Sequence, residues 1–401
     1  MKRSFCFLFA AVLLAGSIFA QTPGENTEST SFRTAHYELF AEPGAENSLP
    51  SLAQELELRF EVYNRLFRFD PAALSNPLRV RVFAVPNAYE SYVSSRIGIR
   101  RAGAVYLHYN IAERRELVIL WGSAEEAYML SHQAFIQFFR GFIPNPPTWM
   151  REGFAIYFNT LRFDPIEESL QYEENLSWLE AVRDLGSRAI TPRELILRDT
   201  VQIHDTSSIG STAGIYSRDF QICSWALVSF FMNSGKYLRS LTESFMVLSP
   251  NSSAVENSQA LMHRFSLWID FYEFDREFAS YLDSRKTFAE LMENGRNAYE
   301  AGDVSGAEIS FLAAQDLRPA HYAPYYYLGL LYYDEKLNDM AEEQYLLSLE
   351  NGADEALVSF ALGVNAISAG RINDGRAWLT RAATADPDRY EIRVTDLLRR
   401  F

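Results

Sequence analysis

Small and large residues recur at a fixed spacing across the last quarter of the chain. Gly295, Gly329 and Gly363 are separated by 34 residues each. A small residue lets two helices approach closely, and a large apolar residue packs against the neighbouring helix. The chain from residue 285 to residue 389 is therefore expected to form three stacked helical hairpins. The other sets with this spacing are Ala307, Ala341 and Gly375; Phe311, Tyr345 and Leu379; and Ala314, Ser348 and Ala382.

This pattern resembles the tetratricopeptide repeat (TPR) family, which has the same period and the same order of small, large and proline positions. Pro319 and Pro387 lie two periods apart, with Ala353 between them. The resemblance implies an all-α solenoid over residues 285–389, with residues 390–401 as a capping helix on the last repeat.

The resemblance also implies a concave face lined by the first helix of each repeat. Because its side chains are mostly aromatic or apolar, we expect a protein or peptide partner to bind there. The alternative is that this face packs on the preceding domain as core, and the sequence leaves both open. The residues assigned to partner binding are Arg296, Tyr299, Tyr326, Leu330, Tyr333 and Phe360.

The start of the chain has the composition of a signal peptide. A basic tip, an apolar run and small residues near Ala20 predict a signal peptide over residues 1–20. Residues 21–33 are polar and are expected to be a flexible tether. No later apolar run has the length of a membrane span. We therefore expect an exported protein, periplasmic or secreted, without a transmembrane segment after signal cleavage. The net charge of −15 argues against a nucleic-acid partner.

A helix pair in the middle of the chain carries the main chemical signal. The segment SHQAFIQFFRGFIPNPPTWMREGFAIYF spans residues 131–158. A helix is expected to end near Gly141, and the IPNPP run forces a turn before a second helix begins near Pro147. Strand patterns at residues 36–43, 78–85 and 115–120, with a helical pattern at 51–69, precede this pair.

The run Trp149-x-x-Glu152-Gly153-x-Ala155-x-Tyr157 resembles the second-helix signature of the peptidase MA-like (gluzincin-type) family of zinc peptidases. We extend this resemblance over residues 34–284, where it implies an α+β domain with a mixed sheet and a helical half. Family members hold zinc between an H-E-x-x-H helix and a second helix that carries a Glu. By position, His132 matches the first ligand and Glu152 the third.

Two positions depart from that motif. Gln133 stands where the family has its general-base Glu, and Ile136 stands where it has its second His. Zinc needs about three protein ligands, and an amide cannot accept a proton from metal-bound water. We therefore expect no catalytic residue, no metal and no cofactor, with His132, Gln133, Ile136 and Glu152 as vestigial positions. The alternative is a replacement ligand from His108, His204 or His263.

The sequence thus predicts an exported, non-catalytic pseudopeptidase that acts as a protein-binding scaffold in the periplasm or envelope. One alternative is a zinc metallopeptidase with a rearranged metal site. A second is a peptide or envelope-polymer binding module in which Arg151 and Glu152 contact the ligand in the vestigial cleft.

Overall fold

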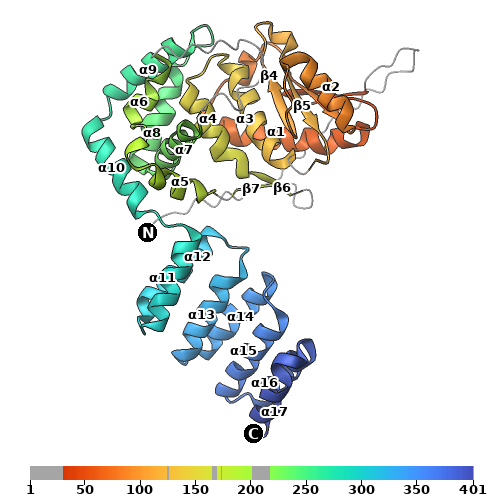
Figure 1. Cartoon of the computed structure of the whole chain (residues 1–401), viewed down its shortest axis with the longest axis vertical. Coiled ribbons are helices and arrows are strands. Elements are labelled where there is room, and N and C mark those ends of the chain that lie inside the picture. The colour runs from red at the N-terminus through yellow and green to blue at the C-terminus, as the bar shows by residue number, and fades with distance from the viewer. Residues whose placement is uncertain (1–29, 124–125, 165–168, 173, 201–216, 401) are drawn as a thin grey trace. The chain divides into compact units, whose positions relative to one another are not determined.

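The computed structural model describes residues 30–123, 126–164, 169–172, 174–200 and 217–400. They form two compact units that divide between Arg285 and Lys286 (Figure 1). The predicted signal peptide and His204 lie outside the described residues. Residues 30–33, which the sequence assigns to the flexible tether, instead form a strand because they pair with the strand that follows. Among the described helices, none is long and apolar enough to cross a membrane.

A five-stranded mixed sheet forms the N-terminal part of the first unit, as the sequence predicts. The strand order is β1-β2-β3-β5-β4, in which β1 and β4 run antiparallel to their neighbours and β2, β3 and β5 are parallel. The strands are β1 Thr30–Arg33, β2 Tyr37–Ala41, β3 Leu78–Phe83, β4 Ala104–Leu107 and β5 Glu116–Leu120. Helix α1 (Leu49–Phe67) connects β2 to β3, and α2 (Pro86–Ile97) connects β3 to β4.

Helices cover both faces of this sheet. On one face, Tyr37 of β2 meets Phe60 of α1, and Phe60 meets Phe138 of α3 (Glu126–Phe142) edge to face. On the other face, α2 packs Tyr89 and Val93 against β3, β4 and β5. The helix α3 that carries the H-Q-x-x-I run is therefore placed directly by the aromatic core.

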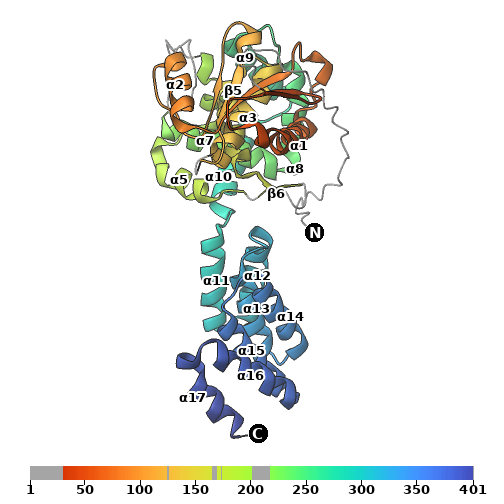
Figure 2. The ribbon, with the colours of Figure 1, turned by 90° about the vertical axis from the view of Figure 1, so that its right-hand side faces the viewer.

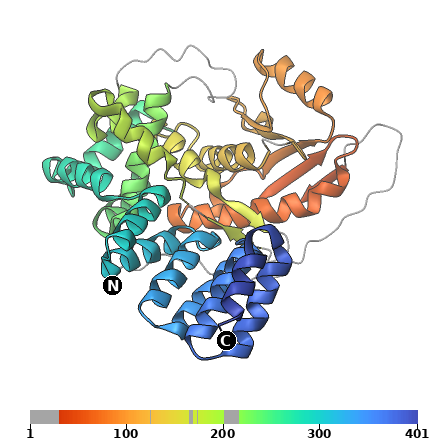
Figure 3. The same cartoon turned by 60° about the horizontal axis from the view of Figure 1, so that its bottom comes forward.

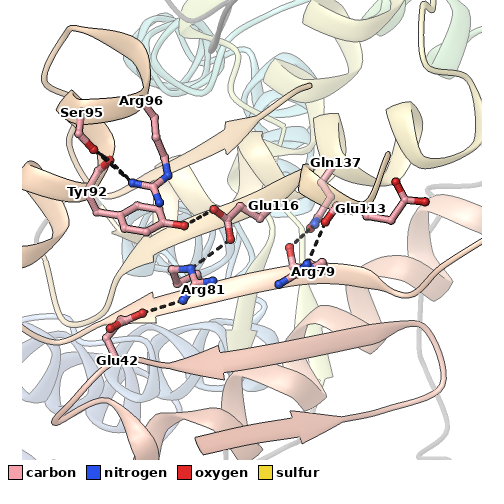
Figure 4. Close-up of polar contacts among 9 residues, drawn as sticks. All are labelled: Glu42, Arg79, Arg81, Tyr92, Ser95, Arg96, Glu113, Glu116 and Gln137. Atoms are coloured by element: carbon pink, nitrogen blue, oxygen red, sulfur yellow. Dashed lines mark hydrogen bonds and ion pairs between the residues drawn. The ribbon is translucent and has the colours of Figure 1, made fainter. Parts of the chain in front are cut away.

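A polar network lies on the α2 side of the sheet (Figure 4). The Arg81 guanidinium donates to Glu42 Oε1 at 2.7 Å and to Glu116 Oε2 at 3.1 Å. The Tyr92 hydroxyl donates to the other oxygen of Glu116, and Arg96 lies over the Tyr92 ring. These contacts tie β3, β5 and α2 together where the apolar cover of the sheet ends.

The helical half of the first unit follows α3. Figure 3 shows these helices beside the sheet. Helix α4 packs closely on α7 at Gly153. A Cβ atom added there would lie 2.5 Å from the backbone oxygen of Ser224, so only glycine allows this approach. The elements are α4 Thr148–Tyr157, β6 Arg162–Asp164, β7 Ser169–Gln171, α5 Ser177–Leu185, α6 Pro192–Ile196, α7 Arg218–Asn233, α8 Gly235–Ser244, α9 Ala254–Ser266 and α10 Phe271–Ser284.

The second unit is a row of helical hairpins with a final single helix (Figure 2). This confirms the predicted TPR-like repeats, although the final helix begins at Pro387, earlier than the predicted residue 390. The helices are α11 Phe288–Glu300, α12 Val304–Leu317, α13 Tyr322–Asp334, α14 Asn338–Glu350, α15 Glu355–Ser368, α16 Ile372–Ala385 and α17 Pro387–Leu398.

The 34-residue spacing has a direct structural cause. In each hairpin the glycine of the first helix faces the large residue of the second, and the pairs are Gly295 with Phe311, Gly329 with Tyr345, and Gly363 with Leu379. A Cβ added at Gly329 would lie 2.5 Å from the Tyr345 ring. Glycine is therefore required by close approach, since these positions have ordinary helical backbone angles.

We predict that Gly329→Ala destabilises the second unit. The added methyl group overlaps the buried Tyr345 ring, and overpacking of this kind costs about 1–3 kcal/mol. Thermal unfolding of the full chain measures the effect. Gly235→Ala is the matched control, because no atom beyond its chain neighbours and its own helix backbone lies within 4 Å of the added Cβ. Equal melting temperatures for the two variants would contradict the packing argument.

Candidate functional site

The four vestigial positions are brought together by α3 and α4, which pack against each other. His132, Gln133 and Ile136 come from α3, and Glu152 comes from α4. All four side chains are buried, with Glu152 completely inaccessible to solvent. The site is therefore part of the core.

Gln133 is bound to the edge of the sheet. Its Oε1 accepts a hydrogen bond of 2.9 Å from the backbone N–H of Tyr106 in β4. Leu120 N donates to Gly103 O across the β4–β5 pair, so the antiparallel alternation turns the Tyr106 N–H away from β5. The amide of Gln133 thus satisfies an edge-strand donor that β5 cannot reach.

The same amide fixes the state of His132. The backbone N–H of Tyr106 can only donate, so the Gln133 amide oxygen Oε1 must face Tyr106. The Gln133 amide nitrogen Nε2 must then face His132. Gln133 Nε2 lies 3.1 Å from His132 Nδ1, which therefore accepts and leaves the ring proton on Nε2. Burial lowers the pKa of His132, the Glu152 charge raises it, and the Arg151 charge lowers it again, with a net lowering. The imidazole is neutral, with its Nε2 blocked by a proton.

Glu152 is neutralised by an arginine of its own helix. Arg151 Nε donates to Glu152 Oε1 at 3.0 Å, and both side chains are buried. The second oxygen, Oε2, has no hydrogen-bond partner among the described residues. An ion pair at this depth compensates the cost of burying the carboxylate.

Zinc does not fit the residues present. His132 offers a protonated Nε2, Ile136 offers no ligand atom, and Glu152 is held by a cation. Within the described ranges, no three His, Cys, Asp or Glu side chains lie close enough together to hold a metal ion.

The two described rescue candidates do not complete the site. His108 lies near Tyr106, with ring centroids 5.9 Å apart, and His263 is exposed on α9. Burial, with the charges of Arg140, Arg115 and Arg151, lowers the pKa of His108 to about 2. His108 is therefore a second neutral imidazole close to several guanidinium groups.

The residues assigned to partner binding lie on the first helices of the repeats. Arg296 is exposed. Tyr299, Tyr326, Leu330 and Tyr333 are half-buried, and they pack against the core of the repeats while keeping part of their surface in solvent. The Tyr299 hydroxyl donates to Asp334. This set forms a partly exposed strip across α11 and α13.

Phe360 packs against the final helix. Its ring lies 5.1 Å from that of Tyr390 in α17, and both belong to the last core cluster. The sequence reasoning treats residues 390–401 only as a cap and misses this contact. The repeat period itself carries the signal, because Tyr390 follows Ala356 by the same 34 residues.

Other residues that sequence reasoning misses are the partners of the vestigial positions. Nothing local to Gln133 reveals its bond to Tyr106, which is 27 residues away. The alternation Arg79-Val80-Arg81-Val82 does indicate a strand with one polar face, and that face holds the Arg81 network.

The solved structures that resemble this chain and are described here each cover less than half of it. No protein-family model matches the chain, and no curated protein matches it. The similar solved structures are TPR proteins. The first TPR of Spaghetti (RPAP3), bound to the HSP90 peptide SRMEEVD, shares 17% identity and covers 28% of this chain and 88% of its own, with a TM-score of 0.27.

Two further solved structures are similar to part of this chain. The type III secretion translocator chaperone SycD of Yersinia enterocolitica shares 19% identity over 29% of this chain and 90% of its own, with a TM-score of 0.27. YrrB, described as a TPR protein with an unusual peptide-binding site, shares 14% identity over 41% and 84%, with a TM-score of 0.26. The resemblance of residues 34–284 to the peptidase MA-like family stays a prediction.

We predict that the first unit loses stability as the pH falls below about 6.5. His108 has a lower pKa in the folded protein than the unfolded value of about 6.5. The unfolded state therefore binds more protons than the folded state as the pH falls. This lowers the free energy of unfolding by about 1 kcal/mol between pH 7 and pH 5.5. Burial of His132 acts in the same direction. Urea unfolding of the unmodified protein and of His108→Gln at both pH values measures the change in the free energy of unfolding. If the variant loses as much stability at pH 5.5 as the unmodified protein, His108 is not the cause.

We predict that tight zinc binding requires three substitutions. In Gln133→Glu with Ile136→His, two imidazoles lie one turn apart, and the new carboxylate accepts from His132 Nδ1–H, which frees Nε2 for metal. In this double variant, Arg151 still forms its ion pair with Glu152. Adding Arg151→Met is expected to raise zinc affinity at least tenfold over the double variant, as measured by competition with a chelating dye.

The single variant Ile136→His is the control for that series, because its His132 keeps the Gln133 bond and a protonated Nε2. Equal zinc affinity in the double and triple variants would show that Arg151 does not compete with the metal. If the triple variant binds no zinc, α3 and α4 are not arranged as a metal site would require.

Proposed function

We propose that this protein is an exported, non-catalytic scaffold, in which a pseudopeptidase unit precedes TPR-like repeats that bind a protein or peptide. The observation that carries the non-catalytic part is the position of Gln133. Its two amide atoms are bound to Tyr106 N–H and to His132 Nδ1, so the residue at the general-base position serves to hold the edge strand and the imidazole.

The electrostatics of the site support this proposal. A peptidase of the type that the sequence resembles needs a carboxylate to take a proton and a metal to polarise water. Here the remaining carboxylate, Glu152, is paired with Arg151, and neither reaches solvent to any useful extent. The metallopeptidase alternative and the cleft-binding alternative both need an accessible cleft, and the burial of His132 and Glu152 favours neither.

The repeat face supports the binding part of the proposal. Tyrosine offers a large contact area and loses little rotamer entropy when it is held in an interface. Tyr299, Tyr326 and Tyr333 keep part of their surface in solvent on neighbouring helices. An exported location, in the periplasm or envelope, rests on the composition of residues 1–20 and is part of the proposal.

The experiment that tests this function selects peptides on the full-length protein from a random displayed library. We expect selected peptides to lose at least tenfold in affinity on Tyr333→Ala. Leu312→Ala is the matched control, because Leu312 is exposed on α12, a second helix of a hairpin, and is not in the strip. With added zinc, the protein should not cleave an unfolded substrate such as casein.

Two results would count against the proposal. Selected peptides that respond equally to both variants would place the binding surface elsewhere. Zinc-dependent cleavage that is lost on Glu152→Gln would favour the metallopeptidase alternative.

A further inference from the structure

The first unit contains a cavity of about 190 Å³ beside helix α10. Its walls come from α5, from the segment that follows α5, from α7 and from α10, which lie together in Figure 1. Small residues leave this space open, since Gly186, Ala189 and Ala279 all belong to its lining. An apolar cavity of about 150 Å³ is enough to hold benzene. The space beside α10 is therefore large enough for a ligand built on a single ring.

The walls of this cavity are held in place by contacts between the elements that form them. Arg183 of α5 donates to the backbone oxygen of Leu282 from Nε at 2.9 Å and from Nη2 at 2.7 Å. The Ile190 N–H donates to Cys223 Sγ at 3.3 Å, which ties the segment after α5 to α7. The ring of Phe278 packs edge to face on a phenylalanine of α7, with 5.4 Å between the centroids. A preformed cavity costs little reorganisation when a ligand enters.

Apolar side chains form most of the lining. Val182 and Cys223 are buried, and Ile190, Phe278 and Leu282 are half-buried around the same space. The Cys223 thiol is uncharged, because burial raises its pKa. A ligand gains free energy here by removing apolar surface from water, so its body is expected to be apolar.

Two charged side chains belong to the lining, and they differ in how they are used. The Arg183 guanidinium is bound to the backbone oxygens of Leu282 and Arg285, where the end of α10 carries partial negative charge. The Asp283 carboxylate is exposed, and within the described residues it forms no hydrogen bond or ion pair. A ligand with a positive group can therefore pair with Asp283, whereas a ligand with a negative group is repelled by it.

We propose that this cavity binds a small apolar amine, with its apolar body between the walls and its ammonium group on Asp283. The amine enters from solvent on the side where Ala279 and Asp283 are exposed. This inference does not rest on the proposed function, because the lining includes none of the vestigial positions and no residue of the strip on the repeats.

The test measures the binding of three matched single-ring compounds to the full-length protein by ligand-observed NMR titration. Phenethylamine carries the positive group, phenethyl alcohol is its neutral equivalent, and phenylacetate carries a negative group. We expect phenethylamine to bind with a Kd of about 1 mM or tighter, which a ligand of this size can reach. Because ion pairs with exposed carboxylates are weak, we expect a preference of about threefold over the alcohol and about tenfold over phenylacetate.

Two variants locate the site. Ala279→Leu fills the cavity and is expected to weaken phenethylamine binding by about tenfold or more. Asp283→Asn keeps the shape of the side chain and should remove the preference for the amine over the alcohol. The control is Asp275→Asn, which removes a carboxylate from α10 outside the lining and should change neither quantity. The melting temperature of each variant shows whether the fold is retained.

Three results would overturn this inference. The first is no binding of phenethylamine at about 10 mM, well above the expected Kd. The second is equal affinity for the three compounds. The third is amine binding that Asp283→Asn leaves unchanged, or that survives Ala279→Leu in a folded variant. Each of these results leaves the proposed function standing, because that function is tested by peptide selection and by Tyr333→Ala in the repeats.

Discussion

One amide group holds the vestigial site in its present state. The Gln133 side chain joins β4 to α3 through Tyr106 N–H and imposes one tautomer on the adjacent imidazole. A carboxylate at the same position would accept from both neighbours and would leave Nε2 of His132 free. The difference between a metal ligand and a core histidine therefore depends on whether residue 133 can donate a hydrogen bond. The residues around His132 are consistent with this. Because the imidazole has no free nitrogen for a metal, a second His is not needed at Ile136, and Glu152 can pair with Arg151.

The buried Arg151–Glu152 pair has a related origin in electrostatics. A carboxylate that is fully removed from water requires a positive charge nearby, and the alternative is protonation. With no second His and no free Nε2, the available cation is the arginine next in sequence. Its charge also acts on His108 and His132 and disfavours a proton on either ring.

The sequence predicts the repeats well because their spacing is set by contacts inside each hairpin. Gly329 meets Tyr345, only 16 residues later, so the pattern repeats wherever the hairpin repeats. The strands of the first unit are likewise visible as local alternation. The partners of Gln133 and Arg81 are not predictable in this way, because they depend on strand order and register. The contact of Tyr390 with Phe360 is intermediate, since the period places both residues but does not show that the two rings pack together.

The largest contacts of each hairpin in the second unit are with its sequence neighbours, which makes the array close to a linear chain of coupled units. The connection between α12 and α13 and that between α14 and α15 are then the boundaries at which the array can open. A segment lying across several first helices would bridge those boundaries and raise the cost of opening each one. Binding of the partner to the folded repeats would then shift the folding equilibrium by mass action. The concentration of the partner would set how long the repeats resist proteases. A short array of this kind can report the presence of its partner through its own lifetime.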